Sequence, residues 1–189
     1  QNIISGLFGS VPASEANKNR TVLIENVEME MTIVGATTEV GSVFGYVTSG
    51  NNVTIRNCFF QNTIRGTATT KIGGIIGGSG TIEIQNNYVN NTQIWETLAD
   101  AVKPNKDSPA RPSSQSGGVV GCADSGATLT IRNTVVASTM ETVNNNISVR
   151  PTGGFVGDSH QKANVTIENS MFCGIDNSLN NWNGGFIGI

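Results

Sequence analysis

The side chains that could do chemistry are few, and most of them follow glycine-rich segments. His160 is the only histidine, in Asp158-Ser159-His160. Adjacent positions in a turn do not give the converging geometry of a catalytic triad, so we expect no catalysis there. Asp124 follows another glycine-rich segment, and we expect it to lie near Asp158. Two carboxylates fall short of the about six to eight oxygens that Ca²⁺ takes, so we expect a solvated turn.

The three cysteines, Cys58, Cys122 and Cys173, occupy different positions relative to the surrounding motifs. Side chains out of register cannot form stacked disulfides, so the pattern predicts free thiols. One histidine and three cysteines also argue against a Cys/His metal cage. The segment 73–80 is rich in glycine but lacks the Lys-Ser/Thr ending of a phosphate-binding loop. The sequence therefore predicts no catalytic residue, no metal ligand and no cofactor.

Composition narrows the class of protein further. The chain has 189 residues, of which 37% are hydrophobic, 13% are charged and 23 are glycine, with a net charge of −3. This balance leaves no basic surface for nucleic acid, and no apolar run approaches the about 18 residues of a membrane span. We expect one β-rich domain over residues 1–189.

A short glycine-rich sequence, here called the glycine cassette, recurs six times. Its last glycines, 9, 45, 77, 121, 157 and 188, are separated by 36, 32, 44, 36 and 31 residues. The copies are 6–9, 41–45, 73–77, 117–121, 153–157 and 184–188. Recurrence at this period indicates a repeat architecture, in which stacked units bury a shared core.

A second motif, here called the strand cassette, follows each of the first five glycine cassettes. Its alternation of apolar and polar residues has the period of a β-strand. Two inward rows are predicted: Val22, Val53, Ile82, Leu129 and Val165, then Ile24, Ile55, Ile84, Ile131 and Ile167. On the outer face, stacking would pair Glu25 with Arg56 and Arg132 with Glu168.

Each strand cassette ends in asparagine. Continuing the alternation predicts an inward, buried ladder of side-chain amides, bonded to one another and to turn backbone, formed by Asn26, Asn57, Asn86, Asn133 and Asn169. A further apolar row on a short third strand is formed by Met29, Phe60, Val89, Val136 and Phe172. The sequence thus predicts an all-β fold: a right-handed parallel β-helix (β-solenoid) of about five coils of 31–44 residues, with three short strands per coil.

The glycine cassette and the Ile-x-Asn ending together resemble the GLUG-type β-solenoid repeats of extracellular surface proteins and adhesins of bacteria, and similar arrays in surface proteins of protists. The likeness is carried by 153–157 with 164–169 and by the matching residues of the other repeats. It implies an extracellular or cell-surface location and a role as a stalk or display surface. The motifs specify an architecture much more than a function.

Three departures from the repeat stand out. The third repeat is the longest, and an inserted surface loop is predicted at about 95–116. Sequons for N-glycosylation occur at Asn19, Asn52, Asn90, Asn146 and Asn164. The last glycine cassette ends in apolar residues, where a capped repeat protein would carry polar ones. We therefore expect an assembly rung there, formed by Phe186, Ile187 and Ile189.

These features favour a structural, non-enzymatic extracellular repeat protein: a surface stalk, an adhesin segment or the subunit of a head-to-tail filament. The expected partners are a second copy or neighbouring repeats of a longer chain, with glycans or surface proteins on the outer face. The alternative is a carbohydrate-binding or carbohydrate-active parallel β-helix protein, similar to polysaccharide lyases and hydrolases. In that case Asp124 and Asp158 would be the residues to test.

Overall fold

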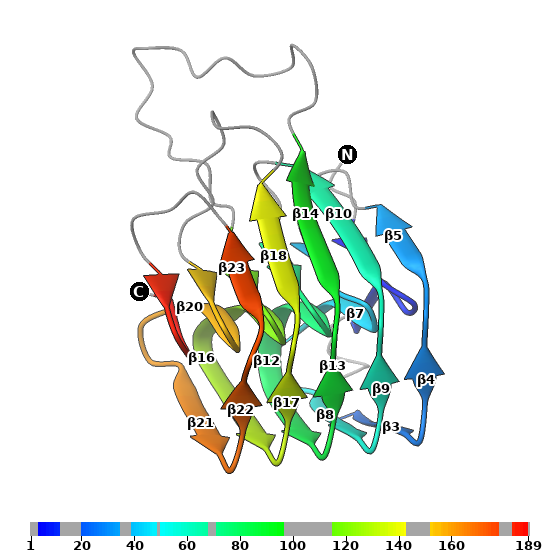
Figure 1. Ribbon diagram of the computed structural model, residues 1–189. Helices are drawn as coiled ribbons and strands as arrows, with labels where there is room; N and C mark the ends of the chain where they lie inside the picture. The colour runs from blue at the N-terminus through cyan, green and yellow to red at the C-terminus, as the bar shows by residue number, and fades with distance from the viewer. Residues whose placement is uncertain are drawn as a thin grey trace, which may run out of the picture.

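The computed structural model describes residues 4–11, 20–34, 39–48, 50–67, 71–96, 115–142, 152–177 and 183–188. Within these ranges the chain forms β-strands and no helix, and every strand pair is parallel (Figure 1). The prediction of an all-β fold is therefore confirmed. Among the described residues there is no helix long and apolar enough to cross a membrane.

The strands form four sheets, here called A to D. Sheet A contains β1 (Ile4–Ser5), β6 (Glu39–Val40), β11 (Lys71–Gly73), β15 (Ser116–Gly117), β19 (Thr152–Gly153) and β24 (Asn183–Gly184). Sheet B contains β2 (Ser10–Val11), β3 (Thr21–Glu25), β7 (Phe44–Val47), β8 (Asn52–Arg56), β12 (Ile76–Gln85), β16 (Val120–Arg132), β20 (Val156–Ser159) and β21 (Asn164–Glu168).

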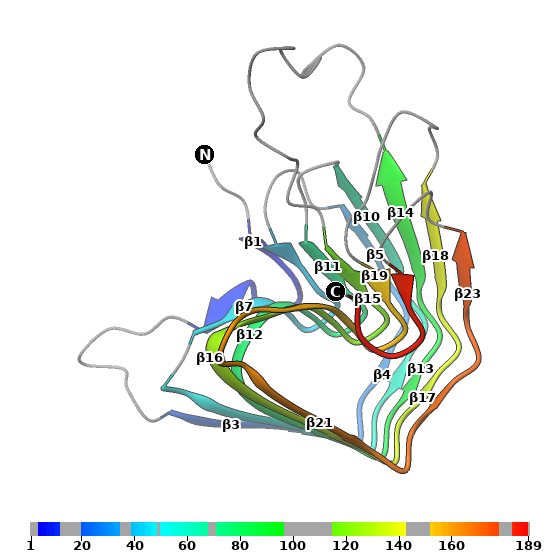
Figure 2. The ribbon, with the colours of Figure 1, turned by 90° about the vertical axis from the view of Figure 1, so that its left-hand side faces the viewer.

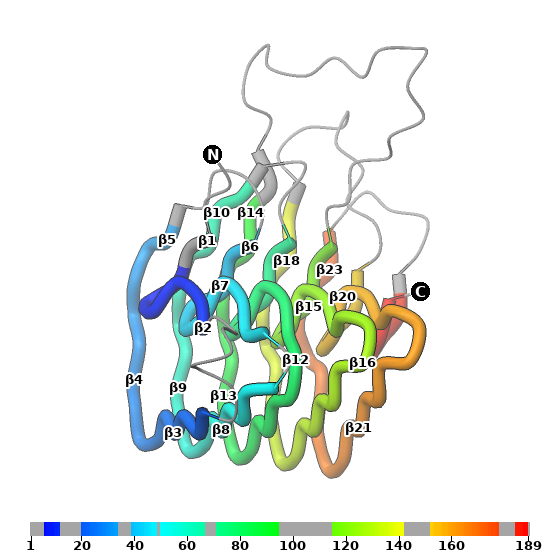
Figure 3. The backbone as a smooth tube through the Cα atoms, turned by 180° about the vertical axis from the view of Figure 1, so that it is seen from behind, coloured from blue at the N-terminus to red at the C-terminus, as the bar shows by residue number. Residues whose placement is uncertain are grey.

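Sheets C and D each have five strands. Sheet C contains β4 (Glu28–Met29), β9 (Phe59–Phe60), β13 (Tyr88–Val89), β17 (Val135–Val136) and β22 (Met171–Phe172). Sheet D contains β5 (Thr32–Val34), β10 (Thr63–Thr67), β14 (Thr92–Glu96), β18 (Thr139–Thr142) and β23 (Ile175–Asn177). Each sheet takes its strands from successive repeats, which lie side by side from one end of the molecule to the other (Figure 3).

Each full repeat passes through the sheets in the order A, B, C and D (Figure 2). The glycine cassette connects sheet A to the first half of sheet B, and the strand cassette forms the second half. The predicted three strands per repeat are therefore too few. Sheet D was not foreseen, and β12 and β16 run unbroken through both halves of sheet B. The sequence of sheet D carries no alternation comparable to the strand cassette.

The predicted stacking of the strand cassettes is confirmed residue by residue. Ile24 pairs with Ile55, Ile55 with Ile84, Ile84 with Ile131 and Ile131 with Ile167, each in parallel register. Because side chains alternate across a strand, this register places the whole isoleucine row on the inner face. The three central members of the row are fully buried, whereas the first and last are half-buried.

The core lies between the sheets as one long cluster, with a smaller second cluster beside sheets A and D. The predicted apolar row of sheet C is part of it, since Phe60, Val89 and Val136 have no exposed surface. On the outer face, the predicted ion pairs are present: Arg56 lies 2.7 Å from Glu25, and Arg132 lies 2.7 Å from Glu168. Most of the loop predicted at 95–116 lies outside the described residues, which resume at Gln115.

Candidate functional site

The glycine cassette positions a dense polar cluster by folding sheet B closely against sheet A. A Cβ atom on Gly121 would lie 2.9 Å from the carbonyl carbon of Ile72, and one on Gly157 would lie 2.5 Å from that of Ser116. Real Cβ atoms essentially never come so close to backbone, so only glycine allows this approach. Residues that start a sheet A strand therefore face residues that follow the cassette in sheet B.

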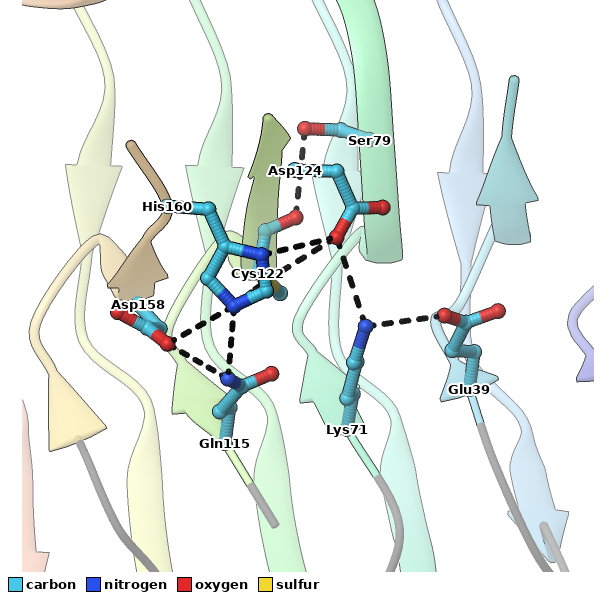
Figure 4. Close-up of polar contacts among 8 residues, drawn as sticks. All are labelled: Glu39, Lys71, Ser79, Gln115, Cys122, Asp124, Asp158 and His160. Carbon is cyan, nitrogen blue, oxygen red and sulfur yellow. Dashed lines mark hydrogen bonds and ion pairs between the residues drawn. The ribbon is translucent and has the colours of Figure 1, made fainter. Parts of the chain in front are cut away.

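Two rows of side chains meet at this junction. The row on the side of sheet A is formed by Glu39 and Lys71, which begin β6 and β11, and by Gln115, which directly precedes β15. The row from sheet B consists of the residue that follows the last glycine in the second to fifth cassettes: Tyr46, Gly78, Cys122 and Asp158, paired in register. Two residues further along, Asp124 and His160 occupy equivalent positions in adjacent repeats. Figure 4 shows the side chains converging from both sheets.

His160 lies at the centre of the cluster. Its Nε2 is 3.2 Å from Asp158 Oδ2 and 3.6 Å from Cys122 Sγ, while its Nδ1 is 3.7 Å from Asp124 Oδ1 (Figure 4). The imidazole thus has a carboxylate at each nitrogen and a thiol beside one of them. In the described part of the chain, Cys122, Asp158 and His160 are the one set of potential metal ligands whose donor atoms all lie within 4.8 Å of one another.

Gln115 and Lys71 complete the cluster. Gln115 Nε2 donates a hydrogen bond to Asp158 Oδ2 at 2.6 Å and lies 3.4 Å from His160 Nε2. Lys71 Nζ bridges Glu39 at 3.2 Å and Asp124 at 3.5 Å. Burial raises the pKa of Glu39, although the charge of Lys71 opposes this. The junction therefore carries three carboxylates and one ammonium group within a chain of direct contacts.

The environment of Cys122 argues against a nucleophilic cysteine. Burial raises the pKa of the thiol, and although Lys71 opposes the shift, the nearby carboxylates of Asp124 and Asp158 reinforce it. The thiolate is the nucleophilic form, and reactive cysteines lie in electropositive, partly exposed surroundings. Cys122 has no exposed surface and faces carboxylates. Despite the neighbouring histidine, the Cys122 side chain is therefore a protonated thiol and not a thiolate.

Sequence reasoning found some members of this cluster and missed others. Asp124 and Asp158 were expected to lie near each other, and the structure places them on opposite nitrogens of His160. The partners of His160 come from the adjacent repeat as well as its own strand, which the expectation about a triad of adjacent residues in 158–160 did not consider. Cys122, Gln115, Lys71 and Glu39 were missed. Counting from the cassette glycines, instead of comparing whole motifs, would have aligned Cys122 with Asp158 and Asp124 with His160.

The asparagine ladder lies on the surface, so its predicted inward placement is wrong. All five residues have a positive φ, between 47° and 57°, and all five are exposed. The strand ends one residue before each of them, and the left-handed turn breaks the alternation on which the prediction relied. Amide-to-amide hydrogen bonds still connect the first four: 3.5 Å from Asn57 to Asn26, 3.1 Å from Asn86 to Asn57 and 3.0 Å from Asn133 to Asn86.

Other asparagines bond the buried turn backbone. Asn87 Oδ1 accepts a hydrogen bond from the Cys58 backbone N–H at 2.9 Å. Asn91 Oδ1 accepts one from the Asn62 backbone N–H at 2.7 Å, and its Nδ2 donates to Gly74 O at 2.6 Å. The three amides are at most 3% exposed. Their positions fall in turns, where a period-two count gives no signal.

A shallow groove of about 590 Å³ runs beside the exposed asparagine ladder. Its walls include the rings of Phe59 and Tyr88, which stack with centroids 5.2 Å apart and planes 12° from parallel. The carboxylate-bearing residue in its lining is Glu28. The groove thus offers an aromatic face beside a row of amides.

The remaining candidate residues are distributed over the molecule. Of the sequons, Asn52, Asn90 and Asn164 are exposed, whereas Asn19 and Asn146 lie outside the described residues. Phe186 is 51% exposed, and Ile187 pairs with Val156 in a single parallel bridge. Ile189 is likewise outside the described ranges. The three cysteines are free, as predicted, with Cys173 exposed and the other two buried.

Comparison of the chain with models of known protein families found no match, and comparison with curated proteins also found none.

Proposed function

We propose that the chain is a structural repeat protein, built as a right-handed parallel β-helix of the GLUG-like type and displayed on a cell surface. Parallel pairing of the same strand positions in successive repeats supports the β-helix, and crossovers between parallel strands are right-handed in nearly all proteins. The location and the stalk or adhesin role rest on the sequence resemblance.

The observation that supports the proposal most strongly is that the large apolar side chains exposed to solvent gather at the two ends of the stack. Seven are exposed in the described part of the chain, and six belong to the first repeat, the fifth repeat or the last glycine cassette. Those six are Leu7, Phe8, Leu23, Met171, Ile175 and Phe186. The seventh, Tyr88, is the residue stacked on Phe59. Both end surfaces therefore combine apolar side chains with strand edges that a further rung would pair.

These end surfaces suit another β-rung, supplied by neighbouring repeats of a longer chain or by a second copy. A second copy would stack head to tail, because parallel pairing joins the last repeat of one molecule to the first repeat of the next. Such heterologous contacts generate open filaments. In either form the molecule works by stacking, and its outer faces remain available for display.

Negative-stain electron microscopy and light scattering over a concentration series test this proposal. Phe186→Asp places a charge on one end surface, and Asn90→Asp places the same charge on an exposed position in the middle of the stack. Fibres of uniform width that the first variant abolishes and the second retains identify a filament subunit. Discrete short rods at every concentration identify a segment of a longer array. Cleavage of an acidic polysaccharide, lost in Asp124→Asn, would overturn the structural role.

Glycan binding is a second candidate function, favoured by the groove beside the asparagine ladder. An aromatic face next to several amides offers both stacking and hydrogen bonds to a sugar ring, as in ligand sites that combine apolar walls with a few fixed polar groups. A glycan array with wild type and Tyr88→Ala would test it. Specific binding that this variant loses supports the candidate, and no binding across the array rejects it.

A further inference from the structure

The donor atoms of Cys122, Asp158 and His160 have the mutual spacing of a metal coordination shell. Zinc bonds of about 2.3 Å to sulfur, about 2.0–2.1 Å to nitrogen and about 2.0–2.2 Å to oxygen place tetrahedral ligands about 3.6 Å (S to N) and about 3.4 Å (N to O) apart. In this protein Cys122 Sγ lies 3.6 Å from His160 Nε2, and His160 Nε2 lies 3.2 Å from Asp158 Oδ2. Cys122 Sγ and the donor oxygen of Asp158 lie within 4.8 Å of each other, so the three donors can surround one cation.

We propose that Cys122 Sγ, Asp158 Oδ2 and His160 Nε2 bind a divalent cation of the zinc class, which joins the fourth repeat to the fifth. The site is independent of the stacking role proposed above. Its ligands come from β16 and from β20 with the residue after it, and Cys122 and Asp158 are direct register partners. The cation would therefore connect two strands that already pair through their backbones.

Gln115 independently indicates a missing partner at this place. Only 6% of the residue is exposed, and its Oε1 is buried without a hydrogen-bond partner within the part of the chain that is described. An unpaired buried carbonyl oxygen costs about 1–3 kcal/mol. Its amide nitrogen already contacts both Asp158 and His160 (Figure 4). Turning the amide over exchanges its oxygen and nitrogen in the same outline and would bring Oε1 to the ligand side, where a cation, or a water bound to one, would be its partner.

Asp124 lies beside the nitrogen of His160 that does not face the proposed metal. Histidines that bind metals through one nitrogen usually donate the other N–H to a carboxylate, which fixes the ring and its tautomer. Asp124 Oδ1 lies 3.7 Å from His160 Nδ1, on the side of the ring away from Asp158. We therefore assign Asp124 as a positioning residue for the metal ligand His160.

Charge and ligand chemistry select the class of cation. Glu39, Asp124 and Asp158 against Lys71 leave two negative charges while Cys122 is a thiol. Binding releases the Cys122 proton, and a divalent ion offsets two of the resulting three negative charges. Sulfur and imidazole ligands favour zinc-like ions over Ca²⁺ and Mg²⁺, which prefer oxygen. Three protein ligands leave a fourth position for solvent, and the His160 side chain is 42% exposed.

Cobalt(II) titration of the chain, stripped with a chelator and kept reduced, tests the proposal, because Co²⁺ reports both thiolate ligation and tetrahedral geometry in its absorption spectrum. We expect one Co²⁺ per chain with a thiolate charge-transfer band, displacement by Zn²⁺, and a rise in Tm when Zn²⁺ is added. Cys122→Ser should abolish the band. Asp124→Asn should keep the tetrahedral spectrum but weaken binding by about 10- to 100-fold.

The matched controls are Cys58→Ser, which removes another buried thiol, and Cys173→Ser, which removes the exposed one. Both should retain the wild-type spectrum. If circular dichroism shows that Cys122→Ser does not fold, His160→Gln decides, because that side chain is partly exposed and should be replaceable without loss of fold. A folded wild type without the band, a band that survives Cys122→Ser or His160→Gln, or a band lost in Cys173→Ser would overturn the assignment.

Discussion

Replacing Asn86 should separate the two ways in which the exposed asparagine ladder stabilises the repeats. Asn86 has a φ of 55°, donates a side-chain hydrogen bond to Asn57 at 3.1 Å and accepts one from Asn133 at 3.0 Å. Asparagine tolerates the left-handed conformation, whereas alanine pays about 1–2 kcal/mol for it. Each hydrogen bond at an exposed position contributes about 0.5 kcal/mol, at the low end of the usual range.

These contributions predict different losses for two variants. Asn86→Ala loses both hydrogen bonds and acquires backbone strain, so the free energy of unfolding should fall by about 2 kcal/mol. Asn86→Gly loses the same bonds without strain, and its loss should be about 1 kcal/mol. Asn90→Ala, at an exposed position with ordinary backbone, is the control and should change stability by less than about 0.5 kcal/mol.

Urea unfolding followed by far-ultraviolet circular dichroism measures the three variants against wild type, with comparison restricted to variants whose m-values agree. Equal losses for alanine and glycine would refute the argument from backbone strain. A glycine variant as stable as wild type would show that the ladder bonds contribute nothing. A control that loses as much as either variant would remove the basis for both estimates.

Three further outcomes are expected. Gly117→Ala places a Cβ against the backbone of Val120, and should cost more than about 3 kcal/mol or prevent folding in an expression and urea-unfolding comparison. Gly185→Ala, with open space around it, should cost less than about 1 kcal/mol in the same assay, and equal losses would contradict the close-approach argument. Burial raises the pKa of Tyr46 to about 12, so absorbance titration should show a tyrosine that ionises near that pH. The free energy of unfolding should fall as pH rises between about 10 and 12, because the folded state holds the phenol proton more tightly than the unfolded state does. Ile84→Ala should cost about 2–5 kcal/mol in urea unfolding and Ile167→Ala clearly less, since the first side chain is fully buried and the second half-buried; a reversed order would refute the packing argument.

The strand cassettes could be predicted from sequence because one physical rule governs them. An alternation of period two, repeated in five copies, determines both the inner face and the register of each strand. The apolar row of sheet C followed from recurrence alone, because its strands have two residues each and lie beyond the turn that breaks the alternation. Short strands in sheets A and D have two to five residues, with little alternation to read. Their pairing is determined by the neighbouring repeats, which the local sequence does not reveal.

The polar cluster was harder to predict because it depends on how closely the backbones of sheets A and B approach each other. Cys122 and Gln115 are seven residues apart in sequence, on opposite sides of a cassette, and they meet at one site because glycines let two backbones nearly touch. The inward placement predicted for the asparagine ladder was wrong for a related reason. One residue with a positive φ turns the side chain outward, and no count of alternating residues registers that change.

The parallel stacking also determines how the molecule responds to mechanical force. Backbone hydrogen bonds between repeats point along the stack, so tension between the two ends pulls on one interface at a time instead of shearing many together. Each repeat that detaches releases the 31–44 residues of its period, or about 100–150 Å of extended chain. A pulled molecule should therefore lengthen in steps, dissipating energy repeat by repeat while the remaining repeats stay folded.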